Sequence, residues 1–69
     1  MPKKIRDLKA MLIKAGFRWR PGKGSHTKWE HPLASKPVVL SGSDGRDARR
    51  YQEEEVRERI EAVRRGQAP

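Results

Sequence analysis

Residues 16–32 read GFRWRPGKGSHTKWEHP, and this stretch decides the fold. Two runs within it, 17–20 and 25–31, alternate apolar and polar side chains, which is the pattern of a half-buried β-strand. The segment PGKG at 21–24 lies between them and favours a tight turn, because proline and glycine both interrupt regular structure. The stretch therefore predicts a β-hairpin whose two strands share one buried face.

An amphipathic helix is expected before the hairpin, over residues 3–15. Its apolar side chains recur at three- and four-residue spacing, so they share one helical face. Gly16 follows at the position where a helix C-cap favours a left-handed backbone. The residues of the apolar face are Ile5, Leu8, Met11, Leu12 and Ala15.

Two further elements are expected after the hairpin. The run PVVL at 37–40 predicts a short third strand with proline at its start, where it costs least. Residues 41–50 have no periodicity and indicate a loop. Residues 51–65 predict a second helix that opens with acids and closes with arginines, as the helix dipole favours. Its narrow apolar stripe consists of Val56, Ile60 and Val63.

The predicted order is therefore α-β-β-β-α, in a single domain that spans residues 1–69. We expect an α+β fold in which two helices cover one face of a three-stranded antiparallel sheet. Double-stranded-RNA-binding domains, which read the shape of a duplex, have the same order of elements. The side chains expected beneath the helices are Phe17, Trp19 and Trp29, and those expected on the opposite face are Arg18, Arg20, His26 and Lys28.

The charge is strongly positive and unevenly distributed along the chain. The formal net charge is +8 for 69 residues. Up to Lys36 there are ten Lys and Arg against two acids, whereas from Pro37 onward seven Arg balance seven acids. A small surface with this charge attracts polyanions, of which phosphate backbones are the commonest. The sequence thus assigns the nucleic-acid-binding surface to the first half of the chain.

Composition also excludes several classes of protein. The chain has no cysteine, so it has neither disulfides nor thiolate metal sites. No apolar run approaches the length of a membrane span, and the N-terminus lacks the apolar region of a signal peptide. We therefore expect a cytoplasmic protein that has no membrane partner and no small-molecule cofactor.

The hairpin stretch resembles the HicA toxins of bacterial toxin–antitoxin pairs. The shared features are a first helix that ends in Gly16-Phe17, the motif GSH at 24–26, an aromatic residue three positions after the histidine, and His-Pro at 31–32. The resemblance covers residues 3–40 well. From Leu40 onward the sequence diverges, because LSGSDG stands where the family usually has Pro-x-His and a basic segment.

The resemblance implies a ribonuclease that cleaves mRNA, is silenced by a HicB-type antitoxin, and uses His26 as its catalytic residue. An imidazole can take a proton from a ribose 2′-OH or give one to the leaving oxygen, and neighbouring cations can stabilise the developing charge. No metal is required for this reaction. The residues expected to bind RNA around His26 are Arg18, Arg20, Lys23, Gly24, Ser25 and Lys28.

Several alternatives remain open at the level of sequence. His26 and His31 have an odd separation, so on a regular strand they point to opposite faces, which argues against a shared metal site. The two tryptophans are interpreted as core residues, although tryptophan can also stack on bases. The alternative functions are a non-catalytic RNA- or DNA-binding module with the same fold, and an interaction protein whose basic face docks an acidic partner.

Overall fold

The computed structural model describes residues 2–66 and confirms the α-β-β-β-α order and the α+β class. Each element begins or ends within a few residues of its expected position. Neither helix within residues 2–66 is long and apolar enough to cross a lipid bilayer. The elements are α1 (Ile5–Lys14), β1 (Arg18–Pro21), β2 (Thr27–Glu30), β3 (Val38–Leu40) and α2 (Arg50–Gly66).

The sheet is antiparallel with β2 in the middle, between β1 and β3. Its register pairs Trp19 with Trp29 and Arg20 with Lys28, and Lys28 in turn with Val39. Directly paired residues lie on the same face of a sheet. Arg20, Lys28 and Val39 therefore share one face, as the alternation in the hairpin predicts.

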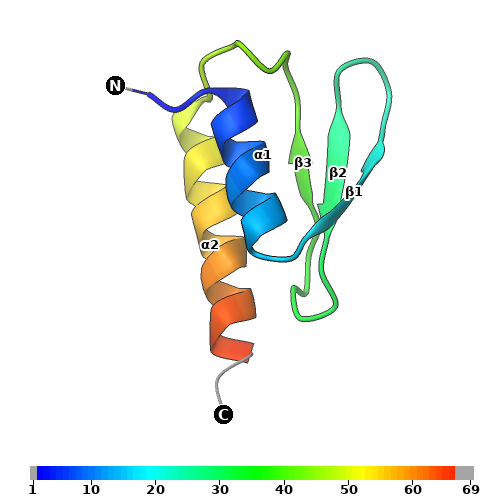
Figure 1. The fold of residues 1–69 in the computed structure, drawn as a ribbon, viewed down its shortest axis with the longest axis vertical. Helices are drawn as coiled ribbons and strands as arrows, with labels where there is room; N and C mark the ends of the chain where they lie inside the picture. Colours follow the sequence, from blue (N-terminus) through cyan, green and yellow to red (C-terminus); the bar gives the residue numbers. More distant parts are fainter. Residues whose placement is uncertain (1, 67–69) are drawn as a thin grey trace.

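Both helices lie on the other face, side by side and running in the same direction (Figure 1). The core between the two layers contains ten buried apolar residues, with Trp29 in the central strand only 1% exposed. The opposite face has no helical cover, and Val39 there is 48% exposed. The core side chains are Ile5, Leu8, Leu12, Phe17, Trp29, Val38, Leu40, Ala48, Val56 and Val63.

The prediction that Trp19 belongs to the buried core is wrong. Trp19 lies on the helix-covered face opposite Trp29, but 54% of its surface is exposed. The reason is that the helices lie toward the β3 side of the sheet, because α2 packs on β3 and α1 packs on α2. All four residues of the edge strand β1 are exposed. Strand alternation assigns Trp19 to the correct face, but the helices do not extend far enough to bury it.

The second strand is shorter than expected, so His26 lies in the hairpin loop rather than within β2. The Gly22 N–H donates to the His26 carbonyl at 2.8 Å and continues the β1–β2 ladder by one pair. The His26 N–H then donates to the Lys23 carbonyl at 3.0 Å, which closes the loop. Residues 22–26 therefore form a compact loop with His26 at its junction with β2.

The loop between β3 and α2 is ordered by its contacts with α1. The N–H groups of Ile5 and Arg6, which have no partner within the first helical turn, donate to the carbonyls of Arg46 and Asp44 at 2.9 and 3.1 Å. The Asp44 carboxylate also pairs with Lys9 at 2.6 Å, and Asp47 pairs with Lys4. This loop therefore caps α1 with backbone groups.

A buried glutamine, Gln52, fixes the start of α2. Its side-chain oxygen accepts the Arg49 N–H at 2.8 Å, and its side-chain nitrogen donates to the Ser41 carbonyl at 3.2 Å. The first of these bonds satisfies a donor at the helix N-terminus, and the second ties α2 to the end of β3. Gln52 is only 4% exposed, so the junction is part of the interior.

Candidate nucleic-acid interface

His26 is exposed, and its position is fixed by the two backbone hydrogen bonds of the hairpin loop. It directly precedes Thr27, whose side chain faces the helices together with Trp29, so alternation places His26 on the open face with Lys28. A methyl group at Gly22 would lie 3.3 Å from the His26 Cβ, which makes these two residues a facing pair. Glycine at 22 therefore avoids a tight contact with the base of the His26 side chain and with the His26 carbonyl.

Ser25 connects the hairpin loop to the β3–α2 loop. Its hydroxyl oxygen accepts the Gly42 N–H at 3.1 Å. Gly42 has a φ of +109°, a backbone conformation that favours glycine, and a Cβ there would lie 3.3 Å from the Arg46 Cδ. The hydrogen bond therefore brings the Arg46 side chain close to the loop that carries His26.

Lys23 and Gly24 form the tip of the hairpin loop, and both are exposed. Gly24 adopts a φ of +59°, the left-handed conformation that this tight loop requires. Nothing within 4 Å would meet a side chain at Gly24, so its backbone is openly accessible. The tip thus offers a cation and an unobstructed stretch of backbone next to His26.

The open face of the sheet carries the expected cations of the hairpin strands. Arg18 and Arg20 are exposed on β1, and Lys28 is partly exposed on β2. Glu30 lies among them, opposite Arg18 in the register, and its carboxylate pairs with Arg20 at 3.2 Å. This surface is therefore positive overall, with one acid that holds Arg20 in place.

The spatial distribution of charge differs from its distribution along the sequence. Lys4, which precedes α1, and Lys9 of α1 pair with Asp47 and Asp44 of the second half. These pairs partly neutralise the first half, while the exposed Arg46 belongs to no ion pair within residues 2–66. The prediction that the positive surface belongs to the first half alone is thus incomplete, because the fold brings Arg46 to the His26 end. Sequence reasoning missed this residue.

His31 lies at the other end of β2, and its contacts are structural. Its ring packs on Phe17 with the centroids 5.2 Å apart, and its Nδ1 accepts the Leu33 N–H at 3.0 Å. Five residues of extended chain separate it from His26, a distance of roughly 17 Å. The two histidines therefore cannot act on one reacting group. No cluster of three or more metal-binding side chains is found within residues 2–66.

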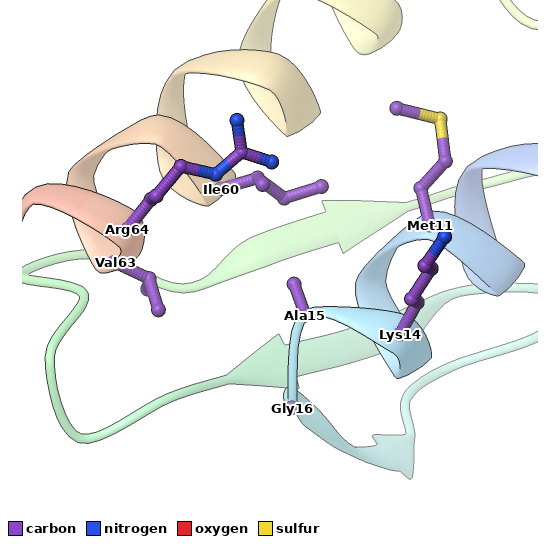
Figure 2. A pocket seen from close by; sticks show the side chains of 7 residues that line it. All are labelled: Met11, Lys14, Ala15, Gly16, Ile60, Val63 and Arg64. Carbon is purple, nitrogen blue, oxygen red and sulfur yellow. The ribbon is translucent and has the colours of Figure 1, made fainter. Parts of the chain in front are cut away.

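A groove of about 570 Å³ lies between the last turn of α1 and the second half of α2 (Figure 2). Met11, Ala15 and Ile60 line it, with Lys14 and Arg64 on opposite sides (Figure 2). None of the residues predicted to bind or cleave RNA lines this groove. The candidate site is instead an open surface formed by the hairpin loop, the uncovered face of the sheet and Arg46.

Together, the fold and this surface define a small basic α+β domain with an exposed histidine beside a glycine-rich hairpin loop. A family model described as the HicA toxin of bacterial toxin–antitoxin pairs matches residues 5–62 of the 69-residue chain. The chain therefore belongs to the HicA toxin family. No curated protein and no solved structure matched the chain. The family match includes the divergent second half as far as residue 62.

Proposed function

We propose that this chain is the toxin component of a type II toxin–antitoxin system and acts in the cytoplasm as a metal-independent endoribonuclease on mRNA. The observation that carries the proposal is the position of His26 in a chain of the HicA family. Its side chain is exposed on a loop that two backbone hydrogen bonds fix, directly opposite Gly22. Lys23 of the same loop and Lys28 on the same face of the sheet add positive charge to this surface.

The proposed reaction needs only proton transfer and stabilisation of charge. The ribose 2′-oxygen attacks the neighbouring phosphorus while the bond from phosphorus to the 5′-oxygen breaks, which yields a cyclic phosphate and a free 5′-OH. The 2′-OH loses a proton, and the leaving oxygen gains one. His26 acts as general base or general acid for one of these transfers.

Residues around His26 are suited to hold the phosphate. The Lys23 ammonium and the open backbone of Gly24 provide a charge and a close approach. Ser25 accepts the Gly42 N–H with its oxygen, so its own hydroxyl hydrogen remains free to donate to a phosphate oxygen. Arg18, Arg20 and Lys28 extend the anion-binding surface along the sheet.

The partner that we propose is a HicB-type antitoxin that masks the same surface. An inhibitor bound elsewhere would leave His26 accessible to a diffusing polyanion, so covering the site is the simplest route to inhibition. The antitoxin is then expected to present acidic groups to these cations, and complementary charge would speed the encounter.

A non-catalytic RNA- or DNA-binding module is the second candidate function. One observation favours it: the other histidine, His31, lies at the far end of β2 and packs on Phe17. The second proton transfer therefore has no histidine to perform it within residues 2–66. In this case the basic surface would bind nucleic acid without cleaving it.

Growth of bacteria that express the chain tests the proposal. Wild-type protein is expected to arrest growth, and His26→Ala is expected to relieve the arrest because it removes the imidazole. His31→Ala serves as the matched control, provided that circular dichroism shows both variants to be folded. Equal toxicity of wild type and His26→Ala at equal protein levels contradicts a catalytic role for His26.

A further inference from the structure

A cleft of about 400 Å³ lies between α1 and the hairpin strands. Arg6, Lys9, Ala10 and Ile13 of α1 line one side, and the other side is formed by Trp19, Thr27 and Trp29. Sequence reasoning did not anticipate this cleft, because it placed Trp19 in the core. The cleft exists because the helices leave the edge strand uncovered.

Trp19 lines this cleft with an exposed aromatic side chain. Its ring lies against Trp29, with the centroids 6.0 Å apart and the planes tilted by 31°. The Trp29 indole N–H already donates to the Thr27 hydroxyl at 2.9 Å. The Trp19 indole N–H has no partner within residues 2–66, so it is free to bind a ligand.

The charges at the cleft favour a ligand that inserts an uncharged group and keeps its negatively charged group outside. Asp44 also lines the cleft and pairs with Lys9 at 2.6 Å, so a phosphate inside it would meet a carboxylate. Arg6, which also lines the cleft, is exposed and belongs to no ion pair within the described residues. It can therefore hold a phosphate outside the cleft while an uncharged group lies within.

We propose that this cleft binds an unpaired base of the RNA, with Trp19 as its stacking surface. The proposal rests on the proposed function, because it requires RNA to be the substrate. Thr27 lines the cleft, whereas the preceding His26 points to the opposite face of the sheet, so an RNA strand that contacts both sites must pass around the hairpin. Aromatic side chains commonly stack on unpaired bases in single-stranded RNA.

A protein segment is the competing occupant, since Ile13 beside the cleft is 59% exposed. Two features favour a base. The cleft is lined by polar as well as apolar side chains, among them Thr27, Lys9 and Asp44, which suits the mixed polar and aromatic character of a base. The flat face of Trp19 matches the flat face of a base, which every nucleotide offers.

Binding measurements in a His26→Ala background test the proposal without cleavage. Fluorescence anisotropy of a labelled single-stranded RNA is measured for Trp19→Ala, for Trp19→Phe and for Tyr51→Ala as the matched control. Tyr51 is aromatic and 58% exposed, close to the 54% of Trp19, but it lies on α2 and does not line the cleft. We expect about tenfold weaker binding for Trp19→Ala, a smaller loss for Trp19→Phe and no change for Tyr51→Ala.

RNA with one base removed separates stacking from a general loss of structure. Removing the base that enters the cleft should weaken RNA binding to the His26→Ala protein about tenfold. The same removal should leave RNA binding unchanged in the protein that carries both His26→Ala and Trp19→Ala. A second measurement does not need the alanine variant: RNA should quench tryptophan emission, and Trp19→Phe should abolish this quenching. Failure of the proposed function appears separately, as an absence of cleavage by the wild-type protein.

Three results overturn the proposal. The first is unchanged RNA affinity in folded Trp19→Ala. The second is that removal of each base weakens RNA binding equally in the protein with Trp19 and in the Trp19→Ala variant. The third is a loss of affinity for the antitoxin alone, which would make the cleft a protein-binding site.

Discussion

Replacement of Trp29 by alanine should remove a large part of the stability of the domain. Trp29 is the largest fully buried side chain and sits in the central strand, within the core to which both helices contribute side chains. Its indole N–H is satisfied internally by Thr27, so the whole side chain belongs to the interior. Alanine would leave a large void and would also free the Thr27 hydroxyl.

The expected cost is comparable to the total stability. Emptying a buried aromatic site typically costs about 3–5 kcal/mol. Natural domains have roughly 0.05–0.15 kcal/mol of stability per residue, which gives about 3–10 kcal/mol for 69 residues. Trp29→Ala therefore removes at least about a third of the unfolding free energy. If the wild-type unfolding free energy is near the lower end of its range, a substantial fraction of the variant molecules is unfolded.

Urea unfolding followed by far-UV circular dichroism measures this loss, with Trp19→Ala as the control on the neighbouring strand. Trp19 is already 54% exposed, so its removal should cost only about 1 kcal/mol, roughly half of what burying a large side chain contributes. A Trp29→Ala protein with the wild-type unfolding midpoint would refute the reasoning. If that protein also bound RNA weakly, Trp29 would be a stacking surface rather than a core residue.

Two further predictions concern the RNA surface. Gly22→Ala should slow RNA cleavage about tenfold, because the added methyl would lie 3.3 Å from the His26 Cβ and the histidine must shift to accommodate it. Unchanged cleavage kinetics in the folded variant would show that the reaction does not depend on this position of His26. Replacement of Arg18 and Arg20 by glutamate should weaken the binding of both RNA and the antitoxin, and should reduce the salt dependence of RNA binding. Arg57→Glu on α2 is the control and should have little effect in the same anisotropy titrations. Tight RNA binding by the preformed toxin–antitoxin complex would contradict a shared surface.

The helices and strands could be predicted from the sequence because the spacing of apolar residues within each element matches its own periodicity. The spacing of Ile5, Leu8 and Leu12 fits one helical face, and all three are buried. The alternation around the glycine-rich turn gave the hairpin and the correct faces of its strands. Trp19 was misplaced because alternation specifies a face of the sheet, whereas burial also depends on how far the helices extend over the edge strand.

The candidate site was only partly predictable, since it combines loops that are distant in the sequence. The motif at 24–26 identified the hairpin loop and His26. The contribution of Arg46 depends on the Ser25–Gly42 hydrogen bond, which joins residues 17 positions apart. Likewise, Asp44 and Asp47 neutralise Lys9 and Lys4 across the fold, which a count of charges along the chain cannot reveal.

Incubation of the purified protein with RNA in the presence of EDTA tests the central claim most directly. Wild-type protein is expected to cleave the RNA and to leave a cyclic phosphate and a 5′-OH at the new ends. The His26→Ala variant, shown to be folded and to bind the same RNA, is expected to leave it intact. Cleavage at the wild-type rate by His26→Ala, or cleavage by the wild type that EDTA abolishes, would contradict a metal-independent reaction that depends on His26.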